Sequence, residues 1–249
     1  MEATRCYNPH LATRPCPTVI VRSLTIRGGV ETDGGGGGIQ NGGTLTLWDA
    51  TVRGNRTANL GGGIYNANNE AVLVLRGSTS VHHNIATING GGIFSDGTVV
   101  MNGSSTVRQN TASSTNPDPV YGGGGIFNQG GELVMNDASS VRHNTALMAG
   151  GGVVSYGPIT MNDDSIIEGN RAAKGGGLHG ARVTMNDRAS ITGNEATVSG
   201  GGIAMHDGAP RYLAGVICGV NIVLNSAPVG PQMYPYIPIA DPQGICGET

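Results

Sequence analysis

The sequence has few charged residues, few aromatic residues and no long apolar run. Of its 249 residues only 12% are charged and 4% are aromatic, and the formal net charge is −3. Average chains carry roughly 25% charged residues, and nucleic-acid binders present a broad basic footprint. We therefore expect no nucleic-acid partner. No run approaches the roughly 20 apolar residues of a membrane-spanning helix, so no transmembrane segment is predicted.

Cysteine is also scarce, and its four copies lie near the two ends of the chain. Cys6 and Cys16 form one pair and Cys218 and Cys246 the other, each in or beside a proline-rich segment. We predict the disulfides Cys6–Cys16 and Cys218–Cys246, with free buried thiols as the alternative. Disulfides imply an oxidising compartment, hence an extracellular or cell-surface location. Residues 1–5 lack the apolar core of a secretory signal, so we expect any export signal to have been removed.

The abundant residue is glycine, and it recurs in register. Of the 44 glycines, many fall in seven runs that each end in an aliphatic residue. The runs are GGGI at 36–39, 61–64, 90–93, 123–126 and 200–203, GGGV at 150–153 and GGGL at 175–178. Self-similarity of this kind is the signature of a repeat architecture.

Each repeat contains short stretches with the alternation of β-strands. One follows the glycine run, as in Ile64-Tyr65-Asn66; a second is a triplet such as Leu73-Val74-Leu75; a third lies around Val81-His82-His83. An apolar period of 3.6 residues does not persist anywhere, so no helix is predicted. Three short strands per repeat of 24 to 34 residues cannot bury their own apolar faces. Stacking of equivalent strands solves this, at ~4.8 Å per coil.

The sequence therefore predicts an all-β fold, a right-handed, single-stranded parallel β-helix (β-solenoid) of about seven recognisable coils. Three apolar ladders should fill a triangular interior: Ile39, Ile64, Ile93, Ile126, Val153, Leu178 and Ile203; Leu47, Leu75, Met101, Met135, Met161 and Met185; Val52, Val81, Val107, Val141, Ile167 and Ile191. We assign residues 1–17 to an N-terminal cap, 18–227 to the β-helix and 228–249 to a proline-rich C-terminal cap or tail. The C-terminal cap could begin near 210.

An asparagine ends each repeat: Asn55, Asn84, Asn110, Asn144, Asn170, Asn194 and Asn225. A line of amides could be a binding strip. We favour a structural ladder, because asparagine tolerates left-handed turns and stacked amides satisfy one another's donors and acceptors.

The GGGI run, the Leu-Thr-Leu strand and the Val-x-x-Asn-x-Ala ending resemble the repeat of the chlamydial polymorphic outer membrane proteins and related pectate-lyase-like surface proteins. The resemblance covers about residues 34–227. Their hallmark motifs are GGA(I/V/L) and FxxN; here the third small residue is glycine, and the Phe position holds the Val or Ile of the third ladder. The resemblance implies an exported β-helix with a role in adhesion.

The outward positions after the third ladder hold basic or titratable residues on four successive repeats, Arg53, His82, Arg108 and Arg142. Such a row would match repeated carboxylates or sulfates of an extended polysaccharide, the alternative being a solvated charged face. Tyr121 ends an insertion, Ser113–Tyr121, that is a further ligand-binding candidate because long loops on solenoids carry function.

Candidates for catalysis are few. Asp163 and Asp164 form an acidic pair that could serve acid–base chemistry. With His179-Gly180 and Arg182 they resemble motifs of the β-helix polygalacturonases, but the register puts Asp163 and His179 on different sides of the coil. No CxxC spacing supports a zinc site, and we predict neither a metal nor a cofactor.

Three hypotheses follow. The leading one is a non-enzymatic adhesin or structural module that binds a glycan or a host or cell-surface protein along its side. The second is a polysaccharide lyase or glycoside hydrolase of pectate-lyase-like fold. The third is a scaffold that self-associates laterally.

Overall fold

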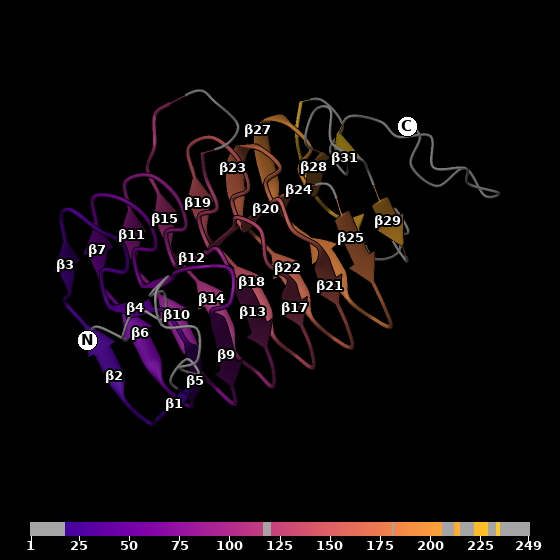
Figure 1. The fold of residues 1–249 in the computed structure, drawn as a ribbon. Coiled ribbons are helices and arrows are strands. Elements are labelled where there is room, and N and C mark those ends of the chain that lie inside the picture. Colours follow the sequence, from indigo (N-terminus) through magenta and orange to yellow (C-terminus); the bar gives the residue numbers. More distant parts are fainter. Residues whose placement is uncertain are drawn as a thin grey trace.

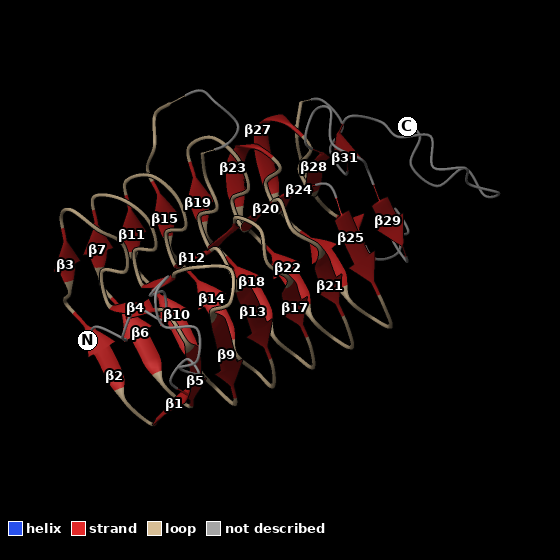
Figure 2. Cartoon of the chain, viewed as in Figure 1, coloured by secondary structure: helices blue, strands red, loops and turns tan. Residues whose placement is uncertain are grey.

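The computed structural model describes residues 18–116, 121–180, 182–205, 212–214, 222–228 and 233–234. These residues form 31 β-strands and no α-helix, and the strands join into four parallel sheets (Figure 2). Successive coils stack in one direction along the molecule, from indigo at the N-terminal end to yellow (Figure 1). The predicted parallel β-solenoid is confirmed, with seven complete four-strand coils, β1–β4 to β25–β28. Strands β29–β31 begin an eighth.

Sheet 1 is built from the predicted Leu-x-Leu segments. Its strands are β1 (Thr18–Arg22), β5 (Thr44–Trp48), β9 (Val72–Arg76), β13 (Thr98–Met101), β17 (Leu133–Met135), β21 (Ile159–Met161), β25 (Arg182–Met185) and β29 (Tyr212–Ala214). In β5, Leu45 and Leu47 are buried while Thr44 and Thr46 face outward, because successive side chains of a strand point to opposite faces. The ladder from Leu47 to Met185 is in register. This prediction is confirmed.

Sheet 2 follows sheet 1 in each coil. Its strands are β2 (Thr25–Arg27), β6 (Thr51–Arg53), β10 (Ser80–His82), β14 (Thr106–Arg108), β18 (Ser140–Arg142), β22 (Ile166–Glu168), β26 (Ser190–Thr192) and β30 (Ile222–Val223). The central residue of each three-residue strand points inward. Val52, Val81 and Val107 are in register and fully buried, as predicted for the third ladder. Each of these strands therefore leaves two side chains on the outer face.

Sheet 3 was missed by the sequence analysis, so the expectation of three strands per repeat and a triangular interior is wrong. Its strands are β3 (Val30–Glu31), β7 (Arg56–Thr57), β11 (Ile85–Ala86), β15 (Thr111–Ala112), β19 (Thr145–Ala146), β23 (Arg171–Lys174) and β27 (Glu195–Ser199). Most of these strands are only two residues long, which is too short for an alternating pattern. Their buried residues are small, such as Ala112 and Ala146, and add little to the apolar signal.

Sheet 4 follows the glycine runs. Its strands are β4 (Ile39–Asn41), β8 (Ile64–Asn66), β12 (Ile93–Ser95), β16 (Ile126–Asn128), β20 (Val153–Ser155), β24 (Leu178–Gly180), β28 (Ile203–Met205) and β31 (Met233–Tyr234). The predicted ladder from Ile39 to Ile203 is in register along the whole sheet. Together with the ladders of sheets 1 and 2, it forms one continuous buried core.

The glycine runs form the corner between sheets 3 and 4, where stacked backbones approach closely. Gly123 has a φ of 65°, in the left-handed region that glycine enters without steric cost. A Cβ on Gly124 would lie 2.4 Å from the carbonyl oxygen of Thr145 and 2.5 Å from that of Gly151. The corner therefore requires glycine for both backbone conformation and space.

The seven asparagines form a buried ladder, which confirms the structural interpretation. In each pair of neighbouring coils, Nδ2 of one asparagine donates to Oδ1 of the next at 2.9–3.0 Å. The same oxygen accepts the backbone N–H of the first asparagine, as Asn110 Oδ1 does from Asn84. Nδ2 of Asn84 also donates to the carbonyl of Val52. The amides are thus occupied by the fold.

Sheet 4 is also covered on its outer face, which sequence periodicity did not predict. Phe94 and Phe127 stack at 5.2 Å between ring centroids and are almost fully buried, together with Val154 and Ala149. Tyr65 packs edge-on against Phe94, and its hydroxyl donates to Asp96. Burial, with the nearby Asp96 carboxylate, raises the pKa of Tyr65 to about 12. A second, smaller core therefore lies outside the solenoid interior.

Several predictions concern residues outside those described. The four cysteines, the caps at 1–17 and at 229–249 apart from Met233–Tyr234, and residues 117–120 of the insertion are among them, so the disulfides and caps stay predictions. Among the described residues, no helix is long and apolar enough to span a membrane.

Candidate functional site

The outer face of sheet 2 carries the predicted row of basic side chains. Arg53, His82, Arg108 and Arg142 lie side by side on neighbouring strands. Arg27 pairs in register with Arg53 and adds a fifth member that sequence analysis missed. Thr25-Ile26-Arg27 matches the pattern of Thr51-Val52-Arg53, but it precedes the first glycine run and so fell outside the aligned repeats. We call Arg27, Arg53, His82, Arg108 and Arg142 the basic row.

A column of hydroxyl groups runs beside the basic row on the same face. It consists of the first residue of each strand: Thr25, Thr51, Ser80, Thr106 and Ser140. Thr106 donates to the Oγ of Ser80 at 3.1 Å, so neighbouring coils are linked along this column. Each of the first four coils therefore presents one hydroxyl and one basic group, whereas Ser140 of the fifth coil is buried. The sequence motif is Ser/Thr, an aliphatic residue, then Arg/His.

His82 is the uncharged member of the basic row at neutral pH. Partial burial, followed by the charges of Arg108, His83 and Arg53, lowers the pKa of His82 to about 4. Both ion pairs found among the described residues lie elsewhere, Arg171 with Glu195 on sheet 3 and Arg188 with Asp164 at the edge between sheets 1 and 2. Within the described structure, the guanidinium groups of the basic row therefore form no ion pair, although Glu168 faces Arg142 from the next coil.

The basic row has a defined length. In the next two coils the equivalent positions are Glu168 and Thr192, so the basic character ends after Arg142. Five positions span four intervals of ~4.8 Å, or about 19 Å along the solenoid axis. A ligand that followed the row would therefore meet up to five successive contacts.

The structure does not bring Tyr121 to this face. Tyr121 is half-buried at the glycine corner, where its carbonyl accepts the N–H of Ala149 at 3.1 Å. Sheet 3 separates that corner from sheet 2 in each coil. Tyr121 therefore cannot share a short ligand segment with Arg108 and Arg142.

Asp163 and Asp164 lie at the edge between sheets 1 and 2, and both have fold-related partners. Oδ2 of Asp163 accepts the N–H of Asp137 at 2.9 Å. Asp164 accepts two hydrogen bonds from Arg188, at 2.5 and 2.6 Å, which lower the pKa of Asp164. His179 is buried in sheet 4, so the geometry keeps it apart from the acidic pair, as the sequence register predicted.

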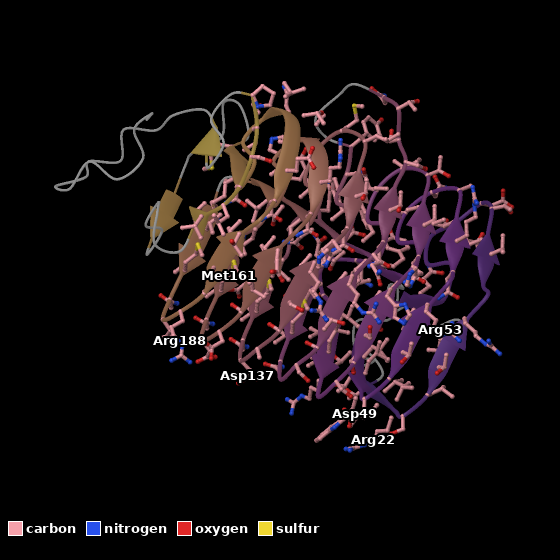
Figure 3. The ribbon with its side chains drawn as sticks, turned by 180° about the vertical axis from the view of Figure 1, so that it is seen from behind. Arg22, Asp49, Arg53, Asp137, Met161 and Arg188 are labelled. Carbon is pink, nitrogen blue, oxygen red and sulfur yellow. The ribbon has the colours of Figure 1, made fainter. Side chains whose placement is uncertain are left out.

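The same edge carries charged side chains from end to end. Figure 3 shows Arg22, Asp49, Asp137 and Arg188 along it, with Arg53 away from this edge. The guanidinium of Arg22 lies 4.2 Å from the ring centroid of Trp48. Asp49 accepts hydrogen bonds from the N–H and the hydroxyl of Ser78, which lower its pKa. The carboxylates at this edge accept hydrogen bonds within the turns between sheets 1 and 2. The acidic side chains therefore lie along a different line from the basic row.

Among the described residues, His, Asp and Glu side chains do not gather in groups of three that could hold a metal ion. A comparison of the chain with protein-family models, curated proteins and solved structures gave no match. The basic face of sheet 2 is therefore the feature from which a function can be argued.

Proposed function

We propose that this protein is an extracellular or cell-surface adhesin or structural module that binds an extended acidic polysaccharide along sheet 2. The four arginines of the basic row supply cations, and their guanidinium forks match carboxylate and sulfate oxygens. His82 adds an uncharged imidazole between Arg53 and Arg108. The hydroxyl column offers further hydrogen bonds to the same ligand. The similarity of the repeats to the chlamydial polymorphic outer membrane proteins is consistent with this role.

The observation that carries the proposal is the stacking of like charges without internal neutralisation. Like charges directly opposite one another on neighbouring strands destabilise a sheet. Arg27 faces Arg53, and Arg108 faces Arg142, in register. A row that merely kept the protein soluble would gain from alternating signs, as Arg171 and Glu195 do on sheet 3. A bound polyanion would relieve the repulsion in the basic row.

The geometry offers less for the enzymatic alternative. A glycoside hydrolase needs two carboxyl groups that flank the scissile bond, one of them with a raised pKa. The pKa of Asp164 is instead lowered by its bond to Arg188, and Asp163 holds the turn of the neighbouring coil. These contacts support the adhesin hypothesis over the enzymatic one.

Retention on a panel of acidic polysaccharides tests the proposal. The panel contains polygalacturonate, alginate, heparin and chondroitin sulfate, and the eluate is assayed for unsaturated and reducing ends. Binding without release of such ends supports the proposal. Turnover that is lost in Asp163→Asn or Asp164→Asn would establish the enzyme instead.

A charge-matched pair of variants locates the site. Arg108→Ala with Arg142→Ala removes two neighbouring cations of the basic row, and the affinity should fall by about tenfold or more. Arg171→Ala with Arg188→Ala removes the same charge from other surfaces and should change the affinity little. Equal losses in the two double variants would mean that binding follows net charge and not the basic row.

A further inference from the structure

The turn that follows each strand of sheet 2 places one residue in the left-handed backbone region. In four coils this residue is glycine: Gly28, Gly54, Gly169 and Gly193, with φ between 61° and 71°. In the third, fourth and fifth coils it is His83, Gln109 and His143, each with φ of 53°. Leu224, with φ of 55°, occupies the position in the eighth coil.

Glycine thus stands at four of these eight turns and a residue with a side chain at the other four. In this conformation the Cβ lies too close to the following carbonyl oxygen, which is why glycine is the usual choice. Residues held in such conformations cluster at binding and active sites, where another requirement outweighs the cost. The position of the three consecutive exceptions is therefore informative.

The three consecutive exceptions follow the last three members of the basic row, His82, Arg108 and Arg142. Where the row position becomes Glu168 and Thr192, the turn returns to glycine. Side chains therefore replace glycine in the third, fourth and fifth coils, which also carry basic residues on sheet 2. Backbone requirements alone would favour glycine in all of these coils equally.

Each of the three side chains is exposed and lies close to its neighbours on this face. Nδ1 of His83 lies 2.6 Å from Nδ1 of His82. Nη1 of Arg108 donates to Oε1 of Gln109. A Cβ on Gly169 would lie 3.1 Å from Cδ2 of His143, so that imidazole covers the next turn. The three side chains form a line parallel to the basic row, in the order imidazole, amide, imidazole.

We propose that His83, Gln109 and His143 form a second row of ligand contacts, which binds sugar hydroxyl groups while the basic row binds the acidic groups. This inference rests on the proposed function. Imidazole and amide groups both donate and accept hydrogen bonds, as hydroxyl recognition requires. The second row confines the centre of the binding face to the third, fourth and fifth coils and selects acidic polysaccharides over polyanions without hydroxyl groups.

The test replaces the second row by the residue that the backbone prefers. The triple variant His83→Gly, Gln109→Gly and His143→Gly should keep or raise the denaturation midpoint, because it removes three left-handed side chains. Its affinity for polygalacturonate should fall about tenfold, equivalent to about 1.4 kcal/mol. Its affinity for inorganic polyphosphate, measured at pH 8 to minimise histidine charge, should stay within about twofold.

Leu224→Gly is the matched control, since it makes the same backbone change three coils beyond His143 and should leave both affinities unchanged. If the triple variant binds polygalacturonate like the unmodified protein while Arg108→Ala with Arg142→Ala does not, the second row is wrong and the proposed function stands. If the unmodified protein retains no acidic polysaccharide, both fail. Gln109→Gly alone keeps the test available should the triple variant not fold.

Discussion

Nδ2 of Asn110 donates to Oδ1 of Asn144 at 3.0 Å, and the same oxygen accepts the backbone N–H of Asn110 at 2.9 Å. One buried side-chain oxygen thus satisfies two donors of the preceding coil. The relationship repeats along the ladder and ties each turn of the chain to the next. It links the stability of one coil to that of its neighbour, as expected for a repeat protein.

Replacing Asn144 by Ala should therefore destabilise the fold strongly. Two buried donors of Asn110 lose their acceptor, at about 1–3 kcal/mol each, so the free energy of unfolding should fall by about 2–6 kcal/mol. Urea unfolding followed by circular dichroism measures this. Asn136→Ala is the control, because the half-exposed amide of Asn136 accepts from Asn162 at 2.7 Å where water can substitute. Similar losses in both variants would contradict the assigned role of the buried ladder.

The glycine corner should not tolerate even a methyl group. In Gly124→Ala the new Cβ would meet backbone oxygens at 2.4 and 2.5 Å, so the stacked coils must separate, and we expect insoluble or largely unfolded protein. Gly54→Ala places its Cβ where no atom lies within 4 Å, with φ of 61°. It should cost only the left-handed conformation, about 1–2 kcal/mol. Soluble yield and the unfolding midpoint compare the two, and a fully stable Gly124→Ala protein would overturn the packing argument.

The methionine ladder should behave as a packed core. Met161 is fully buried between Met135 and Met185, so Met161→Ala should lower the free energy of unfolding by about 2–5 kcal/mol. Figure 3 shows Met161 among the strands, away from the charged edge. Val134→Ala removes apolar volume from the half-exposed outer face of the same sheet and should cost less. A larger loss for Val134→Ala would reverse the assignment of inside and outside.

Stability should depend on pH through His82. The pKa of His82 is about 4 in the folded chain, below its ordinary value of 6.5, so the unfolded chain binds more protons between these values. The contribution of His82 to the free energy of unfolding is therefore complete above pH 6.5 and is lost as the pH falls toward 4. Chemical denaturation at pH 7 and pH 5 measures the loss, which should be smaller in His82→Asn. An identical loss in this variant would show that other groups carry the dependence.

Much of the fold could be predicted from local spacing. The residues from Leu47 to Met185 recur at fixed positions relative to the glycine runs, and stacking repeats must place equivalent residues together. Four members of the basic row followed from this register, because side chains alternate between the two faces of a strand. The register of the first coil could not be predicted, because this coil lacks the full sequence repeat. Arg27 lies in this coil and was therefore missed.

Other features depended on contacts between segments that carry no periodic signal. The two residues Thr111–Ala112 form a strand because the coils before and after supply partners, as their pairing with β11 and β19 shows. Phe94 lies at an outward position of its strand and is buried because residues of other coils, such as Phe127 and Tyr65, pack around it. Neither the strand at Thr111–Ala112 nor the burial of Phe94 could be predicted from the local sequence.

The amino-acid sequence by itself determined that this chain stacks coils of parallel strands and which side chains share a line, because a repeat with buried ladders allows one register. The tertiary structure decided that each coil has four sides, that the outer aromatic groups are covered, and that the arginines of sheet 2 face one another without a carboxylate between them. These properties arise from distances between different turns of the chain, and they exist only once the coils have stacked.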